Sequence, residues 1–154
     1  IRDDAEEIDC NQILKDVLDD LSTQIITTQA KIVSDDLPVI RGYKTYIRLL
    51  FQNLISNAIK FKRENGIHEV KITFLETEKE WSFSVKDNGI GIEEKDLDQV
   101  FVIFKRLNNA SLYRGYGIGL AHCRKIVKMH HGEIHVNSTF GQGSRFTFTI
   151  SKSI

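Results

Sequence analysis

The sequence carries at its centre the run Leu50-Phe51-Gln52-Asn53-Leu54-Ile55-Ser56-Asn57-Ala58-Ile59-Lys60-Phe61, whose apolar residues recur with the period of an α-helix. At about 100° per residue, Asn53, Asn57 and Lys60 fall within roughly 60° of one another. The apolar residues point to another side, so one surface of this helix packs while another offers two amides and an ammonium group. An amide oxygen suits Mg²⁺ and a lysine suits phosphate, although a polar side that faces water is the plainer interpretation of this helix alone.

Two glycine-containing segments follow this helix along the chain. Asp87-Asn88-Gly89-Ile90-Gly91-Ile92 comes directly after a predicted strand, where a carboxylate could accept from an exocyclic amine of a planar ligand. Asp-Asn-Gly is also a common plain turn. Gly115-Tyr116-Gly117-Ile118-Gly119-Leu120 leads into a helix, whose free N–H groups and positive dipole end suit phosphate oxygens. Its glycine spacing fits neither the dinucleotide fingerprint nor the P-loop.

Hydrophobic periodicity predicts the remaining elements. Helical spacing predicts long helices over 11–25, 45–61 and 118–131, and a short helical run over 94–101. We expect Asn11 to cap the first helix and Gly132 to end the last, whose apolar face includes Met129. Alternating or β-branched runs predict strands over 30–33, 39–41, 70–75, 81–86, 133–138 and 145–150. Long helices with antiparallel hairpins indicate a two-layer α/β sandwich, a single domain over 1–154.

The composition excludes several classes of protein. Lys+Arg and Asp+Glu both total 21, so no net charge draws the chain toward nucleic acid. Cys10 and Cys123 lack the spacing of a zinc site or a disulfide framework and fit a reducing compartment. No apolar stretch approaches the ~20 residues of a membrane span, and residues 1–7 do not form a signal peptide. The missing initiator Met suggests a fragment of a longer protein.

The polar motifs occur together in the order found in sensor histidine kinases. The run 50–61 resembles their N box, 87–92 their G1 box, 100–107 their F box, 115–120 their G2 box, and 140–146 the glycine-serine hairpin that ends the domain. From Ile8 to Ile150 the chain is similar to the ATP-binding catalytic domain of two-component histidine kinases, in the wider group that includes gyrase, the Hsp90 chaperones and MutL. The short segment between Phe104 and Gly115 resembles the phytochrome-related branch.

This resemblance implies a Bergerat-type ATP-binding fold, a mixed and mostly antiparallel sheet packed against three long helices. It implies ATP and Mg²⁺ as ligands, with Asn57 holding the metal and Asp87 receiving the adenine amine. Phe61 would lie along the adenine, and Gly89 and Gly91 would give the base room. The resemblance assigns a catalytic role at the phosphate end to Asn53, Lys60 and Arg106, and a phosphate-side loop to Gly115, Gly117 and Gly119. Phosphoryl transfer needs positioning and charge neutralisation more than covalent help, and these groups supply both.

The resemblance also implies partners outside this chain. In the family, the phosphate acceptor is a histidine on a separate helical dimerisation domain, within a His-Glu-x-x-x-Pro pattern. The only proline here is Pro38 and no histidine precedes it, so the acceptor is expected elsewhere in the parent protein. Residues 1–5 are interpreted as the end of the connection to that domain, the isolated chain as a monomer and the parent as a homodimer. A response regulator downstream and a cytoplasmic location are expected, with membrane attachment of the parent left open.

Two other functions stay open. Tyr116 stands where the family more often has a small or aliphatic residue, which keeps a pseudo-kinase module that acts by docking as an alternative. A superfamily ATPase is the other, and Asn53 disfavours it because such relatives carry a carboxylate there to activate water. The five histidines, among them His68, His130 and His131, are expected to be partly exposed and without a catalytic role.

Overall fold

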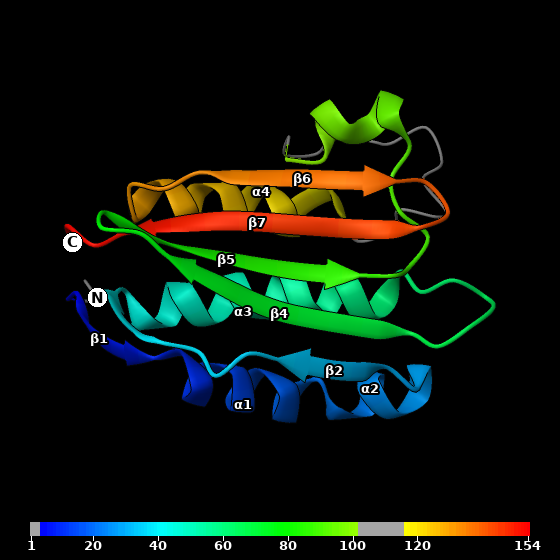
Figure 1. The fold of residues 1–154 in the computed structure, drawn as a ribbon, viewed down its shortest axis with the longest axis horizontal. Coiled ribbons are helices and arrows are strands. Elements are labelled where there is room, and N and C mark those ends of the chain that lie inside the picture. The colour runs from blue at the N-terminus through cyan, green and yellow to red at the C-terminus, as the bar shows by residue number, and fades with distance from the viewer. Residues whose placement is uncertain (1–3, 102–115) are drawn as a thin grey trace.

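The computed structural model describes residues 4–101 and 116–154. Its helices are α1 (Cys10–Asp20), α2 (Ser22–Thr28), α3 (Lys44–Lys60), the 3₁₀ helix η1 (Glu94–Gln99) and α4 (Tyr116–Met129). Its strands are β1 (Glu6–Asp9), β2 (Lys31–Ser34), β3 (Val39–Gly42), β4 (Glu69–Glu76), β5 (Glu80–Asp87), β6 (Ile134–Thr139) and β7 (Gly143–Ser151). Figure 1 shows α3 and α4 lying behind the strands of one sheet.

The larger sheet has the strand order β2-β4-β5-β7-β6. β2 runs parallel to β4, whereas the β4–β5, β5–β7 and β7–β6 pairs are antiparallel. The mixed, mostly antiparallel sheet of the prediction is therefore confirmed, as are its two hairpins. In Figure 1 α3 and α4 cover the rear face of this sheet, and no helix of the described residues crosses the front face.

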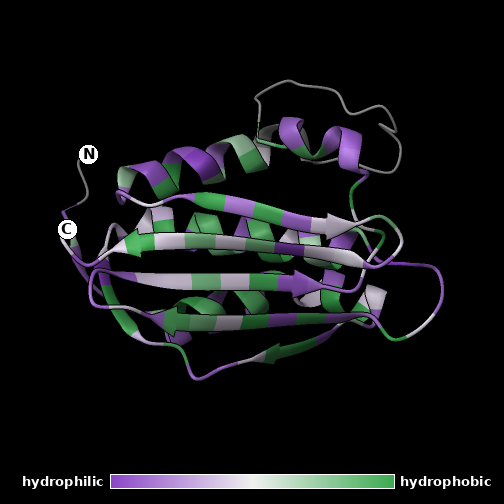
Figure 2. Ribbon diagram, turned by 45° about the horizontal axis from the view of Figure 1, so that its top comes forward, coloured by the Kyte–Doolittle hydropathy of each residue, from purple (hydrophilic) through white to green (hydrophobic). Residues whose placement is uncertain are grey.

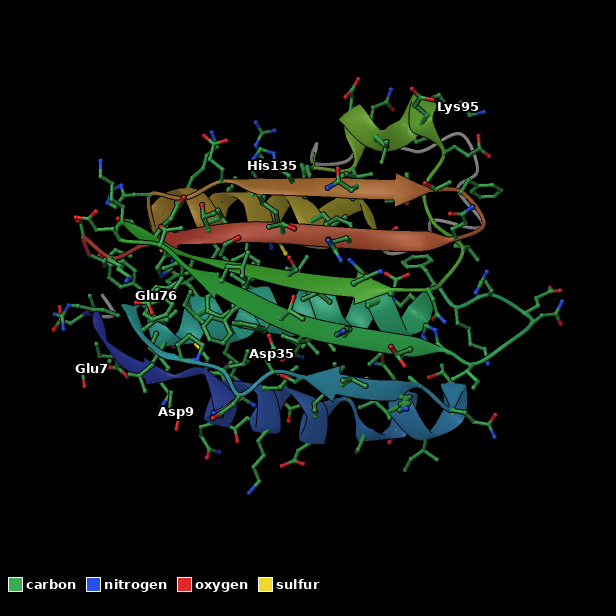
Figure 3. The ribbon with its side chains drawn as sticks, viewed as in Figure 1. Glu7, Asp9, Asp35, Glu76, Lys95 and His135 are labelled. Atoms are coloured by element: carbon green, nitrogen blue, oxygen red, sulfur yellow. The ribbon has the colours of Figure 1, made fainter. Side chains whose placement is uncertain are left out.

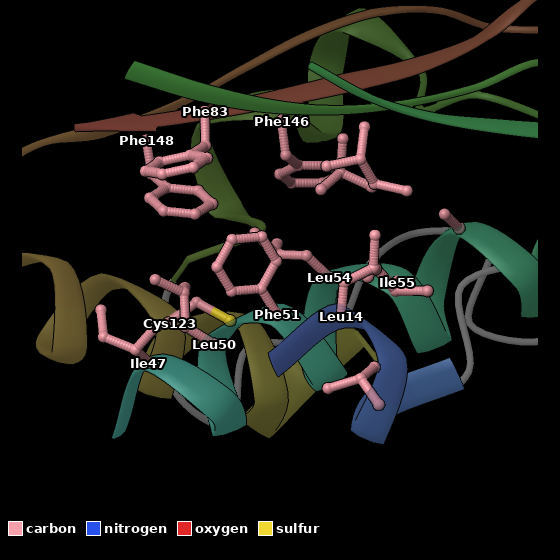
Figure 4. Close-up of a cluster of buried hydrophobic side chains, with 14 of the residues drawn as sticks. Leu14, Ile47, Leu50, Phe51, Leu54, Ile55, Phe83, Cys123, Phe146 and Phe148 are labelled. Atoms are coloured by element: carbon pink, nitrogen blue, oxygen red, sulfur yellow. The ribbon is translucent and has the colours of Figure 1, made fainter. Parts of the chain in front are cut away.

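The core lies between the sheet and these helices. Phe83 and Phe148, on the neighbouring central strands β5 and β7, stack with their ring centroids 5.3 Å apart. The ring of Phe51 on α3 meets each of them edge-on at 5.5 Å. Figure 4 shows these rings pointing toward one another, with Leu14 of α1 and Cys123 of α4 in the same cluster. Apolar and polar residues alternate along the strands in Figure 2, so one face of the sheet builds the core and the other meets solvent.

The N-terminal region differs from the prediction. The expected helix over 11–25 is two helices, which meet at Leu21. Asp9, and not Asn11, caps α1, because the Asp9 carboxylate accepts from the backbone N–H of Asn11 at 3.0 Å. The Asn11 side chain instead accepts from the N–H of Leu37 at 2.8 Å. The strand β1, which pairs with β3, was not predicted because Ile8 is its single buried residue and leaves no alternation to detect.

The ends of α4 also differ from the prediction. The helix begins at Tyr116, before the expected start, and ends at Met129, which is 40% exposed and so not part of the apolar face. The left-handed backbone that follows the helix is at His131, with φ of 57°, and not at the predicted Gly132. Gly132 is needed for another reason, since a Cβ there would lie 1.8 Å from the carbonyl oxygen of Thr149.

His68 and His130 are buried, so the expectation of partial exposure is wrong for both. The Nε2 atom of His130 accepts from the backbone N–H of Tyr43 at 3.0 Å, which leaves Nδ1 to donate to the carbonyl oxygen of Ile126 at 2.7 Å. These bonds tie the end of α4 to the start of α3 and require a neutral ring. Burial lowers the pKa of His130 below its ordinary value, because the imidazolium form would lose its hydration.

We expect the His130→Gln variant to be less stable than the natural chain by about 1–3 kcal/mol near pH 8, through its lost hydrogen bonds. That difference should shrink as the pH falls below 6.5, the ordinary pKa of histidine, because the unfolded chain then takes up a proton that folded His130 resists. Thermal midpoints of both chains across this pH range test the prediction, with the exposed His135→Gln as control. A stability difference that does not change with pH would contradict it.

Candidate active site

The site is centred on Asp87, the last residue of β5. Asp87 is only 5% exposed, and its Oδ1 accepts from the backbone N–H of Gly89 at 2.8 Å. Burial raises the pKa of Asp87 to about 6, although the backbone N–H groups of Gly89 and Ser144 act in the opposite direction. Within the described part of the chain, no lysine, arginine or histidine forms an ion pair with Asp87. A buried carboxylate that is charged at neutral pH and held by backbone donors alone is suited to accept from a ligand.

Gly89 and Gly91 allow the backbone to turn tightly after Asp87 and to pack against other backbone segments. A Cβ at Gly89 would lie 2.0 Å from the carbonyl oxygen of Phe61, and one at Gly91 would lie 2.3 Å from that of Thr139. Gly91 also has φ of +73°, which an L side chain rarely adopts. These glycines are therefore required by the approach of backbone to backbone, and the room for a base that the resemblance implied stays a prediction.

Hydrogen bonds join three segments around Asp87. The N–H of Ile90 donates to the carbonyl oxygen of Phe61 at 2.9 Å, and the N–H of Gly141 donates to that of Ile90 at 2.6 Å. Arg63 closes the network by donating from Nη1 to the carbonyl oxygen of Gly141 at 3.0 Å. The end of α3, the loop after β5 and the β6–β7 hairpin thus form one frame around the carboxylate.

The polar face of α3 leads away from this frame. Because α3 is continuous from Lys44 to Lys60, Asn53, Asn57 and Lys60 lie on one face as predicted. Asn53 donates from Nδ2 to the carbonyl oxygen of Gly119 at 3.5 Å, which joins α3 to the first turn of α4. Asn57 is only 6% exposed and its Nδ2 has no hydrogen-bond partner among the residues that the structure describes, whereas Lys60 is exposed. A helix face that simply meets water does not explain an unpartnered, buried amide.

Comparison with known proteins agrees with this arrangement. The model of the histidine kinase-, DNA gyrase B- and HSP90-like ATPases matches residues 42–154. The chain belongs to this ATPase family. Within it, cyanobacterial phytochrome A of Nostoc sp. (strain PCC 7120) is 46% identical over 137 residues, which cover 89% of this chain and 18% of that protein. The adaptive-response sensory kinase SasA of Gloeothece citriformis is 38% identical over 141 residues, covering 92% of this chain and 35% of SasA.

A solved structure of the same ATPase family agrees in fold. The catalytic domain of the histidine kinase ThkA superposes with a TM-score of 0.81 at 25% identity, covering 97% of this chain and 98% of that one. The sequence relatives are histidine kinases that this chain spans in part, between about a fifth and two fifths of their length. The chain is therefore the ATP-binding catalytic module of a sensor histidine kinase, with the Bergerat-type fold that the motifs implied.

The other predicted site residues agree with the structure to different degrees. Phe61 ends α3 and belongs to the buried core, so its contact with adenine stays a prediction. Gly117 and Gly119 lie in the first turn of α4 and not in the loop that the resemblance implied, whereas the helical period had already included Gly119 in the helix over 118–131. The first N–H groups of a helix lack partners within it and suit phosphate oxygens all the same. Arg106 and Gly115 lie outside the described residues.

Sequence reasoning missed two residues that support this ATPase site. Ser144 is 4% exposed, its backbone N–H faces the Asp87 carboxylate, and its Oγ lies 2.8 Å from Oγ of Ser138. Its place in the glycine-serine hairpin was a signal that could have found it. Arg63 had no such signal, because its partner, Gly141, lies far along the chain.

The residues present fit a metal carried by the nucleotide and not one held by the protein. No cluster of three or more His, Cys, Asp or Glu side chains is placed to hold an ion in residues 4–101 and 116–154. Asn57 offers an amide oxygen on the polar face of α3, beside an Nδ2 that is buried and has no hydrogen-bond partner among the described residues. Mg²⁺ binds readily through one or two protein oxygens together with phosphates and water.

Among the described residues, no helix has both the length and the apolar character needed to cross a lipid bilayer.

Proposed function

We propose that this module binds Mg-ATP and transfers the terminal phosphoryl group to a histidine on a separate dimerisation domain of its parent protein. The observation that carries the proposal is Asp87, whose buried carboxylate has backbone donors and forms no ion pair in the described part of the chain. The amine of adenine would donate to this group, and guanine, with a carbonyl oxygen in that place, would be repelled.

The phosphates would lie between the polar face of α3 and the first turn of α4. Lys60 would neutralise phosphate charge, and Asn57 would hold Mg²⁺, which supplies further neutralisation when bound. Asn53 supports transfer over hydrolysis, because an amide cannot act as the base that activates water. Its hydrogen bond to Gly119 gives it a different task, which is to fix the first turn of α4 against α3.

The parent would act as a homodimer, receive a signal through its other domains and pass the phosphoryl group to a response regulator. The cytoplasm is the proposed compartment for this module. The two described thiols, Cys10 and Cys123, are free and buried, and burial raises the pKa of each to about 12. Thiols that stay protonated are inert, which fits a structural role in a reducing compartment.

Titration with a fluorescent ATP analogue, with and without Mg²⁺, tests the proposal directly. We expect binding in both cases and tighter binding with the metal. No saturable binding at millimolar nucleotide would contradict the proposal and favour a pseudo-kinase module that acts by docking.

The Asn57→Ala variant should lose the Mg²⁺-dependent part of nucleotide binding while its thermal midpoint stays close to that of the natural chain. The buried Nδ2 has no hydrogen-bond partner in the described part of the chain, so its removal deletes no hydrogen bond seen there and should cost little stability. Parallel titrations with and without Mg²⁺, together with thermal unfolding, check both expectations. If the variant unfolds, the polar face of α3 is structural and its ligand role is wrong.

A further inference from the structure

The outer face of the larger sheet carries a row of three cations. The strand registers pair Lys71 of β4 with Lys86 of β5, and Lys86 with Arg145 of β7. All three side chains are exposed and point away from the core, since their strand neighbours Val70, Val85 and Phe146 are buried. Figure 1 looks onto this face, and Figure 3 shows the side chains in the same view, with His135 of β6 labelled. We call Lys71, Lys86 and Arg145 the basic row.

This arrangement costs the free domain stability. Like charges that stand directly opposite each other on neighbouring strands repel, and the basic row contains two such pairs in succession. None of its members forms an ion pair with a carboxylate among the described residues. Other exposed cations do have such partners: Arg48 contacts Asp20, and Lys152 contacts Glu76. The carboxylate of Glu69 lies beside the basic row and lines a hollow that it shares with the row, but it forms no ion pair with the row, whose own members stand opposite like charges.

Open space surrounds the row. One shallow hollow of about 340 Å³ beside Lys86 is also lined by Lys31, Glu69 and Ile67, and Ile67 is 76% exposed. A second hollow of about 270 Å³, on the other side of Lys86, reaches Arg145 and Asn137. The next cross-strand row is made of small hydroxyl side chains, such as the hydrogen-bonded pair Ser84 and Thr147.

We propose that the basic row is a docking site for a carboxylate-rich segment of a partner protein. The segment would cross β4, β5 and β7, with acidic side chains on the basic row and one apolar side chain against Ile67. Charge complementarity would set its position and speed its association.

The same face argues against other occupants. Glu80 and Glu133 lie toward the opposite end of the sheet and would repel a long polyanion such as DNA. A membrane surface is disfavoured because Ile67 is the only apolar side chain among the described residues that line the two hollows.

The first test uses Lys86→Glu, which places a carboxylate between two cations. Both cross-strand contacts change from repulsive to attractive, so we expect the thermal midpoint to rise by about 3 °C. Lys15→Glu, a change of equal charge on α1, should not raise it. A lower midpoint for Lys86→Glu would overturn the claim that the row costs stability.

The second test measures binding of a short fluorescent oligoglutamate peptide with a central leucine, by anisotropy at low salt. Binding should weaken by about tenfold in Lys86→Glu and in Lys71→Glu, weaken with added salt, and be unchanged in Lys15→Glu. ATP affinity of Lys71→Glu should stay unchanged, since Lys71 points to the outer face, whereas Asp87 is paired with the buried Val70 and its side chain points to the core face. These results together would support the proposal.

Several results would overturn it. One is equal binding of an oligoglutamine peptide, and another is equal weakening by Lys15→Glu. Comparable binding of duplex DNA or of anionic phospholipid vesicles would assign the row to a different class of partner. A dimer in sedimentation that Lys86→Glu abolishes would assign it to a second copy of the chain.

Discussion

Asp87→Asn is expected to weaken ATP binding by about 100-fold, the equivalent of about 2.7 kcal/mol. The variant keeps an oxygen that can accept from the N–H of Gly89, but it loses the negative charge that a ligand amine would meet. The natural chain should also prefer ATP over GTP. Competition against a fluorescent ATP analogue measures both effects, with Asp19→Asn on the exposed side of α1 as a control of equal charge change.

The same variant should not be less stable near pH 8. Folding raises the pKa of Asp87 to about 6 from 3.8, so the ionised carboxylate opposes folding above that range and the opposition fades as the pH falls through 6. Asparagine removes this charge, so its thermal midpoint should be at least as high as that of the natural chain near pH 8. ATP affinity of the natural chain should fall as Asp87 takes up a proton below about pH 6. Equal affinity for ATP and GTP, or unfolding of the variant, would falsify the adenine assignment.

The isolated chain, incubated with radiolabelled ATP and Mg²⁺, should bind nucleotide and yet acquire no acid-labile phosphate. Phosphoryl transfer needs a nucleophile in line with the terminal phosphate, and the family's acceptor pattern does not occur in this sequence. Adding the parent's acceptor domain as a separate protein should restore labelling, but slowly. Without a tether the two domains lose their high effective concentration.

Two variants separate transfer from binding in this assay. Lys60→Ala should reduce labelling of the acceptor more than it reduces ATP affinity, if the ammonium acts on charge that develops at the terminal phosphate. Lys62, next but one along the chain, donates from Nζ to the carbonyl oxygen of Thr28, so Lys62→Ala is a matched control that should affect neither strongly. Efficient labelling of the chain alone, or rapid ATP hydrolysis without an acceptor, would mean that the proposed reaction class is wrong.

Local sequence determined the elements and the parts of the site that lie within one of them. The helical period of the segment 45–61 placed Asn53, Asn57 and Lys60 on one face, because positions three and four apart meet on any α-helix. Alternation over 70–86 placed Asp87 at the end of a strand in a hairpin, and the structure confirms both. Where the local signal was weak, as in the four residues of β1, the prediction failed.

The order of the motifs predicted the protein family, which hydrophobic periodicity could not do. Each polar segment taken singly had a plain structural interpretation, and their joint order identified the family before any contact was known. The order of the motifs does not determine how their residues are arranged in space. It did not show that Gly89 and Gly91 serve backbone packing, or that Gly117 and Gly119 lie inside α4.

Tertiary structure alone decided the contacts between segments that lie far apart in the sequence. Arg63 reaches Gly141, Asn53 reaches Gly119, and His130 bonds to Tyr43, none of which follows from a local pattern. The alignment of Lys71, Lys86 and Arg145 likewise depends on the registers of three strands. The physical reason is that a period fixes which way a side chain points, whereas its burial and its partner depend on how the whole chain packs.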